Sequence, residues 1–179
     1  MYRELDQVLA YHCGPALAGV KAANLVSLSL EEFPELRETA AKYNRLFQGK
    51  GVSFRLLCGC GKRALLLVYR EEQLAAELLR RDGYPEGADV ERLLELLSTR
   101  LRMGKEFPHE IGLFLGYPPE DVLGFQRYRG QNCKLCGYWK VYSDVDRARV
   151  LFRLYDRCRE VLCRRVARGM TLSEVFLAA

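Results

Sequence analysis

The sequence predicts an α+β protein in which an antiparallel sheet of three to four strands is packed by about seven helices. Two observations carry this prediction. Segments with apolar residues at helical spacing recur along the chain, and short runs rich in branched and aromatic residues lie between them. A length of 179 residues fits a single globular domain spanning residues 1–179.

The N-terminal half alternates between the two patterns. In chain order, we expect a helix at Tyr2–His12 ended by Gly14-Pro15, a strand within Val20–Leu30, a helix at Glu31–Phe47, strands at Val52–Leu57 and Arg63–Arg70 joined by a turn at Cys58–Lys62, and a helix at Glu71–Arg81. The run Arg63–Arg70 is apolar on both faces, which is typical of a central strand covered on both sides.

The C-terminal half is mainly helical. We expect helices from Asp89 to Arg102, at His109–Leu115, at Pro119–Tyr128 and at Val145–Ala167, a strand at Tyr138–Tyr142, and a terminal helical turn at Thr171–Leu177. Asp89 is a good N-cap, and Pro119 suits a first helical turn because proline has no N–H to leave unsatisfied.

Composition limits the class of protein. With 49% hydrophobic and 28% charged residues the chain is too apolar to be disordered. No apolar run approaches the ~18 residues of a transmembrane helix, and the N-terminus lacks a signal-peptide pattern, so we expect a cytoplasmic protein without a membrane partner. A net charge of +5 is weak evidence for nucleic acid, and we expect no nucleic-acid partner. Seven cysteines in a reducing compartment indicate metal binding, redox chemistry or packing.

Two cysteine pairs have the spacing of metal knuckles. Cys58 and Cys60 stand in a C-x-C-G turn, and Cys133 and Cys136 stand in a C-x-x-C-G turn, whose glycine permits a tight turn behind the second thiol. Four thiolates would suit zinc or iron. The alternatives are packing thiols and redox-reactive thiols, and on a regular strand Cys133 and Cys136 would point to opposite faces.

Each histidine has a reactive neighbour. The pair His12-Cys13 could supply a nucleophile or two metal ligands, although a structural reading makes His12 a cap of the helix end. The pair His109-Glu110 could do acid–base work or bind metal, although a solvated helix start is the alternative. A zinc-protease motif is excluded because its second histidine would stand at Leu113.

The stretch His109–Phe125 also has the rhythm of a helix-turn-helix. The first turn of its second helix carries Glu120 and Asp121, whose carboxylates would repel DNA phosphates. We therefore interpret the stretch as a helical corner used for packing.

The run Tyr138–Tyr142 alternates its side chains between two faces, with Lys140 between two tyrosines on one face and Trp139 on the other. The face that carries Lys140 could hold an anion or a flat ligand, and Lys21 and Asn24 could join that site. The alternative is a plain exposed sheet face.

The motifs Phe107–Phe125 (FPHEIGLFLGYPPEDVLGF) and Trp139–Tyr142 (WKVY) resemble the signatures of a family of small bacterial proteins from anaerobic Firmicutes, a domain of unknown function. The resemblance covers nearly the whole chain. Signature runs of that family include His12, Cys13, Lys21, Asn24, His109, Glu110, Trp139 and Lys140. The Cys58–Cys60 turn is not part of its pattern, whereas cysteines near position 133 are typical of it. Members tend to be encoded near flavodoxin-type electron carriers, which implies a redox or iron setting and such a carrier as partner.

From the residues and the resemblance together, we expect a cytoplasmic accessory or binding protein linked to the redox or metal physiology of anaerobes. Its pocket would lie at the His12-Cys13 corner and His109. One alternative is a small enzyme that uses Cys13 or His109. A more distant alternative is a helix-turn-helix DNA-binding protein.

Overall fold

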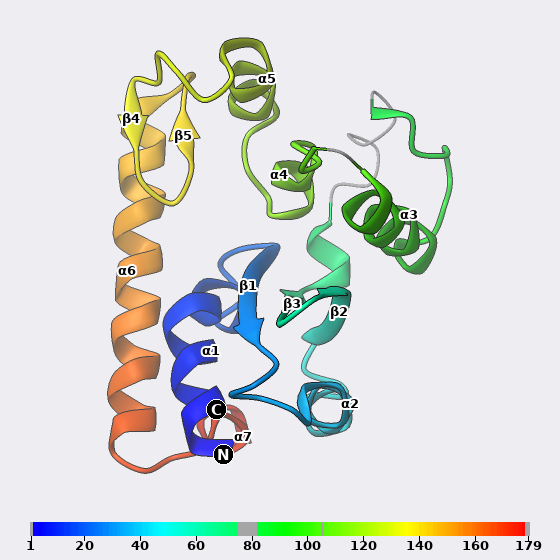
Figure 1. Ribbon diagram of the computed structural model, residues 1–179. Helices are drawn as coiled ribbons and strands as arrows, with labels where there is room; N and C mark the ends of the chain where they lie inside the picture. Colours follow the sequence, from blue (N-terminus) through cyan, green and yellow to red (C-terminus); the bar gives the residue numbers. More distant parts are fainter. Residues whose placement is uncertain (1, 75–81, 105, 178–179) are drawn as a thin grey trace.

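A computed structural model describes residues 2–74, 82–104 and 106–177. Across these residues the fold is α+β, as predicted, with seven α-helices, a three-stranded sheet and a two-stranded ribbon (Figure 1). The helices are α1 (Tyr2–Leu17), α2 (Leu36–Leu46), α3 (Val90–Met103), α4 (Ile111–Phe114), α5 (Pro119–Tyr128), α6 (Val145–Ala167) and α7 (Leu172–Leu177). The strands are β1 (Ala23–Ser29), β2 (Ser53–Cys60), β3 (Arg63–Tyr69), β4 (Leu135–Cys136) and β5 (Lys140–Val141), and η1 (Glu71–Gln73) is a 3₁₀ turn. None of the helices described is both long and apolar enough to cross a membrane.

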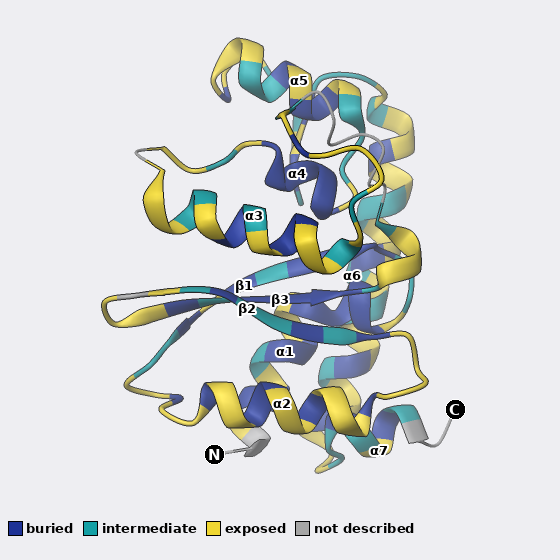
Figure 2. Cartoon of the chain, turned by 90° about the vertical axis from the view of Figure 1, so that its right-hand side faces the viewer, coloured by how far each residue is buried: buried dark blue, intermediate teal, exposed yellow. Residues whose placement is uncertain are grey.

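The main sheet has the order β1-β3-β2, and both pairings are antiparallel. The prediction that the Arg63–Arg70 run forms the central strand is confirmed. Alternate residues of β3 face opposite ways: Leu66 and Val68 join the core beside α1, α2 and α7, and Leu67 and Tyr69 join the core beside α3 and α4. Figure 2 shows the sheet edge-on between these two helical layers.

The first helix is longer than the sequence suggested. The prediction that Gly14-Pro15 ends it is wrong, because α1 runs on to Leu17 with Pro15 inside it. Gly14 is the point where α1 crosses α6: a Cβ there would lie 3.1 Å from the Cα of Arg159. The glycine therefore permits close helix packing, which compensates for its low helix propensity.

The end of α1 is held by two polar side chains from the sheet. The side-chain oxygen of Asn24 accepts a hydrogen bond of 3.0 Å from the N–H of Ala16. The guanidinium of Arg70 donates to the carbonyls of Ala16 and Leu17, each at 2.9 Å, and to that of Lys50 at 3.2 Å. One N–H and two carbonyls near the end of α1 thus bind side chains on β1 and directly after β3.

Four other predicted elements differ in extent. The expected helix at His109–Leu115 covers only Ile111–Phe114, as α4. The expected helix Glu31–Phe47 begins at Leu36, after turns. The expected helix Glu71–Arg81 begins as η1, and its later part lies outside the described residues. The run Tyr138–Tyr142 is not in the main sheet; within it only β5 is a strand, and it pairs with β4 in a ribbon beside α5 and α6 (Figure 1).

Candidate functional site

An apolar cavity of about 340 Å³ lies where the α4–α5 corner meets the β4–β5 ribbon. Two separate segments of the chain build it, and they are the two that carry the signature motifs. The lining residues are Phe107, His109, Ile111, Gly112, Tyr117, Asp121, Val122, Phe125, Cys136, Gly137, Trp139 and Lys140. A cavity of this size, with mainly apolar walls and a few polar groups, has the character of a small-molecule site.

Flat aromatic rings form much of the wall. The rings of Tyr117 and Trp139 stack with centroids 5.2 Å apart and an interplanar angle of 27°. The rings of Trp139 and Phe152 pack edge to face, with centroids 4.6 Å apart, which restrains the orientation of the indole. The imidazole of His109 contacts the ring of Phe125 edge-on at 5.1 Å. Such walls suit a flat, largely apolar ligand.

The cavity also has two groups that can donate to an acid. The ammonium of Lys140 donates a hydrogen bond of 2.5 Å to the carbonyl of Gly130 and keeps further N–H groups. His109 is exposed and lines the same cavity. The structure thus brings together two of the predicted site residues, His109 and Lys140, with Cys136 beside them.

Asp121 lines the cavity, but its carboxylate is fully engaged in holding the ribbon. One oxygen accepts a hydrogen bond of 2.7 Å from the indole N–H of Trp139. The other oxygen accepts hydrogen bonds from the backbone N–H groups of Tyr142, at 2.8 Å, and Ser143, at 2.7 Å. Burial alone raises the pKa of this carboxyl, but these hydrogen bonds together hold the pKa below its ordinary value. Asp121 therefore points into the fold and not toward DNA phosphates.

The predicted His12-Cys13 corner does not reach the cavity. Because α1 continues, Cys13 lies within the helix, fully buried in the core below the sheet. Burial raises the pKa of its thiol to about 12, so it carries almost no thiolate at neutral pH. His12 is exposed on the same helix, where its ring contacts Tyr11 edge-on at 4.9 Å.

Two further predicted residues have structural partners. Asn24 binds the end of α1, as described above. Glu110 is buried, and its carboxylate accepts a hydrogen bond of 2.6 Å from Arg100 on α3. It also accepts one of 3.3 Å from the hydroxyl of Tyr84. Neither residue is among those that line the cavity.

Lys21 is close to the cavity without lining it. Only 4% of the residue is exposed, and its Nζ lies 4.9 Å from the centroid of the Tyr117 ring. Burial lowers the pKa of this amine to about 7, and the neighbouring Cys13 opposes the shift. Lys21 therefore lies near the Tyr117 ring of the cavity wall as a partly neutral amine.

The predicted four-cysteine metal site is not supported. Cys58 lies on β2 in the main sheet, whereas Cys133 and Cys136 lie at the ribbon (Figure 1), and the side chain of Cys60 is outside the part described. Within residues 2–74, 82–104 and 106–177, no group of three or more His, Cys, Asp or Glu could hold a metal ion. The ribbon pair alone is drawn together, with its sulfurs 2.9 Å apart.

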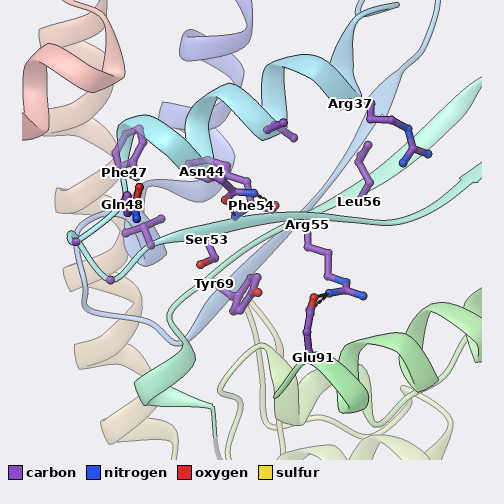
Figure 3. Close-up of a pocket in the computed structure, with 15 residues that line it drawn as sticks. Arg37, Asn44, Phe47, Gln48, Ser53, Phe54, Arg55, Leu56, Tyr69 and Glu91 are labelled. Atoms are coloured by element: carbon purple, nitrogen blue, oxygen red, sulfur yellow. Dashed lines mark hydrogen bonds and ion pairs between the residues drawn. The ribbon is translucent and has the colours of Figure 1, made fainter. Parts of the chain in front are cut away.

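A larger groove of about 620 Å³ runs along the edge strand β2, between α2 and α3 (Figure 3). Several of its polar groups already have partners within the fold. The side-chain amide of Asn44 exchanges hydrogen bonds with the backbone N–H and carbonyl of Phe54, at 2.7 and 2.9 Å, and Arg55 pairs with Glu91. Asn44 thus covers part of the open sheet edge, which protects it from strand pairing with another chain. We therefore favour the apolar cavity as the site.

Sequence reasoning missed Tyr117, Phe125 and Asp121 as parts of the site. Each lies in the signature stretch Phe107–Phe125, and that stretch was the signal that could have found them. Arg70 was also missed, and nothing in its local sequence shows that it would bind carbonyls on α1.

One polar atom beside the site is buried without a partner among the described residues, the hydroxyl of Tyr142. Tyr142→Phe is therefore expected to raise the free energy of unfolding by about 1 kcal/mol, because an unsatisfied buried hydroxyl costs stability. Tyr138→Phe is the matched control. It removes a hydroxyl that donates a hydrogen bond of 2.9 Å to Asp156, so it should lower the free energy of unfolding by about the same amount. Urea unfolding followed by Trp139 emission measures both, and equal losses in the two variants would contradict the prediction.

The fold and the cavity together define an α+β protein with one small aromatic-walled pocket between a helical corner and a ribbon. The chain belongs to the family described as protein of unknown function DUF3793, which it matches over residues 9–176. The resemblance to a domain of unknown function is thereby confirmed. Comparison with curated proteins and with solved structures gives no match.

Proposed function

We propose that this protein is an accessory binding protein whose cavity holds a small, flat, largely apolar ligand with one acidic group. The observation that carries the proposal is the combination of stacked aromatic walls with Lys140 and His109 in one cavity of about 340 Å³. The rings would cover the faces of the ligand, and the two side chains would bind its acid.

Binding is favoured over the enzyme alternative by the positions of the reactive groups. Cys13 is buried in α1 and its thiol has a raised pKa. His109 lines the cavity, but the neighbouring carboxylate of Glu110 is directed to Arg100 and so does not orient the imidazole. The DNA-binding alternative has little support. The first turn of α5 presents the exposed carboxylate of Glu120, which would repel DNA phosphates.

A role in the redox physiology of the cytoplasm, with a flavodoxin-type electron carrier as partner, remains part of the proposal. Its support on the molecule is the Cys133–Cys136 pair, since Cys136 lines the cavity. Zinc or iron at the predicted four-cysteine site is not included.

The test uses anilinonaphthalene sulfonate, a flat apolar probe with one anionic group. We expect saturable binding at one site per chain, with transfer of excitation from Trp139, which is the only tryptophan and lies in the wall. Lys140→Met should weaken this binding about tenfold or more, because a hydrogen bond to a charged group contributes about 1.5–3 kcal/mol.

Lys134→Met is the matched control for that experiment. Lys134 stands on the same ribbon, is exposed, and donates 3.0 Å to the carbonyl of Ser143 without lining the cavity. It should leave the affinity within about twofold, since a distant exposed charge is screened. Equal weakening by both substitutions, or binding that does not quench Trp139, would contradict the proposal.

A further inference from the structure

The ribbon places two thiols side by side at the surface. The sulfurs of Cys133 and Cys136 are 2.9 Å apart in hydrogen-bond contact. A regular strand would have directed them to opposite faces, but β4 begins only at Leu135. Asn132, directly before the pair, has a left-handed backbone with φ 56°. The chain therefore turns before Cys133, and both side chains reach the same side.

The ribbon that carries the pair is held firmly. Asp121 binds the indole of Trp139 and two backbone N–H groups beyond β5. Gly137 lies directly against the ring of Phe152, where a Cβ would approach to 2.1 Å, so only glycine fits behind Cys136. The two thiols are thus presented in a fixed relation and do not depend on a mobile loop for their approach.

Solvent reaches the pair. Cys136 is exposed and Cys133 is half-buried, as Cys58, Cys158 and Cys163 are, whereas Cys13 is fully buried. The two sulfurs of a disulfide are about 2.05 Å apart. The sulfurs of Cys133 and Cys136 would therefore have to move together by less than about 1 Å from their separation of 2.9 Å. A tetrahedral zinc site would instead spread the two sulfurs to about 3.8 Å and require further ligands. No third ligand stands with them in the part of the chain that the structure describes.

We propose that Cys133 and Cys136 form a reversible dithiol–disulfide site that exchanges with small or protein disulfides. One thiolate of the pair attacks a sulfur of the partner disulfide R–S–S–R, and one R–S⁻ leaves and is protonated. The other thiol, deprotonated, then attacks the first cysteine sulfur, and the second R–S⁻ leaves. The protein gains one S–S bond and loses two hydrogens, while the partner is reduced to two thiols.

The test treats the reduced full-length chain with oxidised glutathione. The wild-type chain should lose two hydrogen atoms by mass, and a digest should show Cys133 linked to Cys136. The mixed disulfide with glutathione should not accumulate on the pair, because the second step is intramolecular, whereas an adduct on Cys58 should persist. Excess reduced glutathione should restore both thiols.

Two variants make the result decisive. Cys133→Ser should stop at a stable glutathione adduct on Cys136, and Cys58→Ser, in the main sheet, should behave as wild type. Adducts that accumulate on the wild-type pair without a cross-link would overturn the proposal. A chain that stays reduced, or one purified with stoichiometric zinc that blocks exchange, would overturn it as well. The readout is independent of probe binding by the cavity, so the dithiol site and the ligand-binding cavity can fail separately, whereas the proposed redox role rests on the dithiol site.

Discussion

Asp121→Asn is expected to lower the free energy of unfolding by about 2–4 kcal/mol, the largest loss from any single polar substitution near the site. The carboxylate accepts three hydrogen bonds while the residue is only 2% exposed. An amide of the same shape can still accept the two backbone bonds with its oxygen. Its NH₂ group then faces the indole N–H of Trp139, donor against donor, and the charge that strengthened all three bonds is gone.

Urea unfolding, followed by the emission of Trp139, measures the effect. The control is Glu120→Gln, the exposed neighbour at the start of the same helix, which should change stability by less than about 0.5 kcal/mol. If Asp121→Asn cost no more than this control, the ribbon would not depend on Asp121.

The same carboxylate should make stability depend on acidity. Its folded-state pKa lies below the ordinary 3.8, so the ionised group contributes stability above that value and loses the contribution as pH falls toward the folded-state pKa. The difference between wild type and Asp121→Asn should therefore shrink when unfolding is measured below about pH 3.8 rather than at neutral pH. A difference that stays constant across this range would contradict the role of the charge.

The elements that the sequence predicted well are those whose signals are local. Asp89 accepts from the N–H of Arg92 as an N-cap does, and Pro119 begins α5 as its fixed φ favours. The apolar run of β3 showed that this strand is covered on both faces. What could not be predicted depends on distant partners. Gly14 looked like a helix stop because its contact with Arg159 lies far along the chain.

Only part of the candidate site could be expected from the sequence, for the same reason. His109 was expected at the pocket and Lys140 on a ligand-binding face, and both side chains line the cavity. Cys13 was expected there too, but that expectation depended on a helix end that does not exist. The acid at Asp121 suggested repulsion of phosphate, whereas its oxygens bind Trp139 and the ribbon. Sequence order does not show which way a side chain on a corner will turn.

Lys21→Met is expected to raise the free energy of unfolding by about 2–4 kcal/mol at or below neutral pH. The amine is almost wholly buried, and burial lowers its pKa from 10.5 to about 7. Below about pH 7 the folded protein therefore carries a buried charge, compensated in part by the ring of Tyr117. Methionine keeps the apolar stem and removes the charge, so the cost of desolvation disappears.

The pH dependence separates this cause from better packing. Between the folded-state pKa of about 7 and the unfolded value of 10.5, the unfolded chain holds a proton that the folded chain has released. The free energy of unfolding of the wild type therefore rises with pH in this window, by about 1.4 kcal/mol per pH unit. The gain in the free energy of unfolding from Lys21→Met should therefore be largest below pH 7 and shrink toward pH 9. Urea unfolding at a series of pH values measures this gain. The control is Lys134→Met at an exposed position, which should show no such trend. A pH-independent gain would point to packing alone. The variant could also be stabilised and yet bind anilinonaphthalene sulfonate more weakly. In that case Lys21 acts on the cavity through Tyr117, because the Tyr117 ring contacts Lys21 and also lines the cavity.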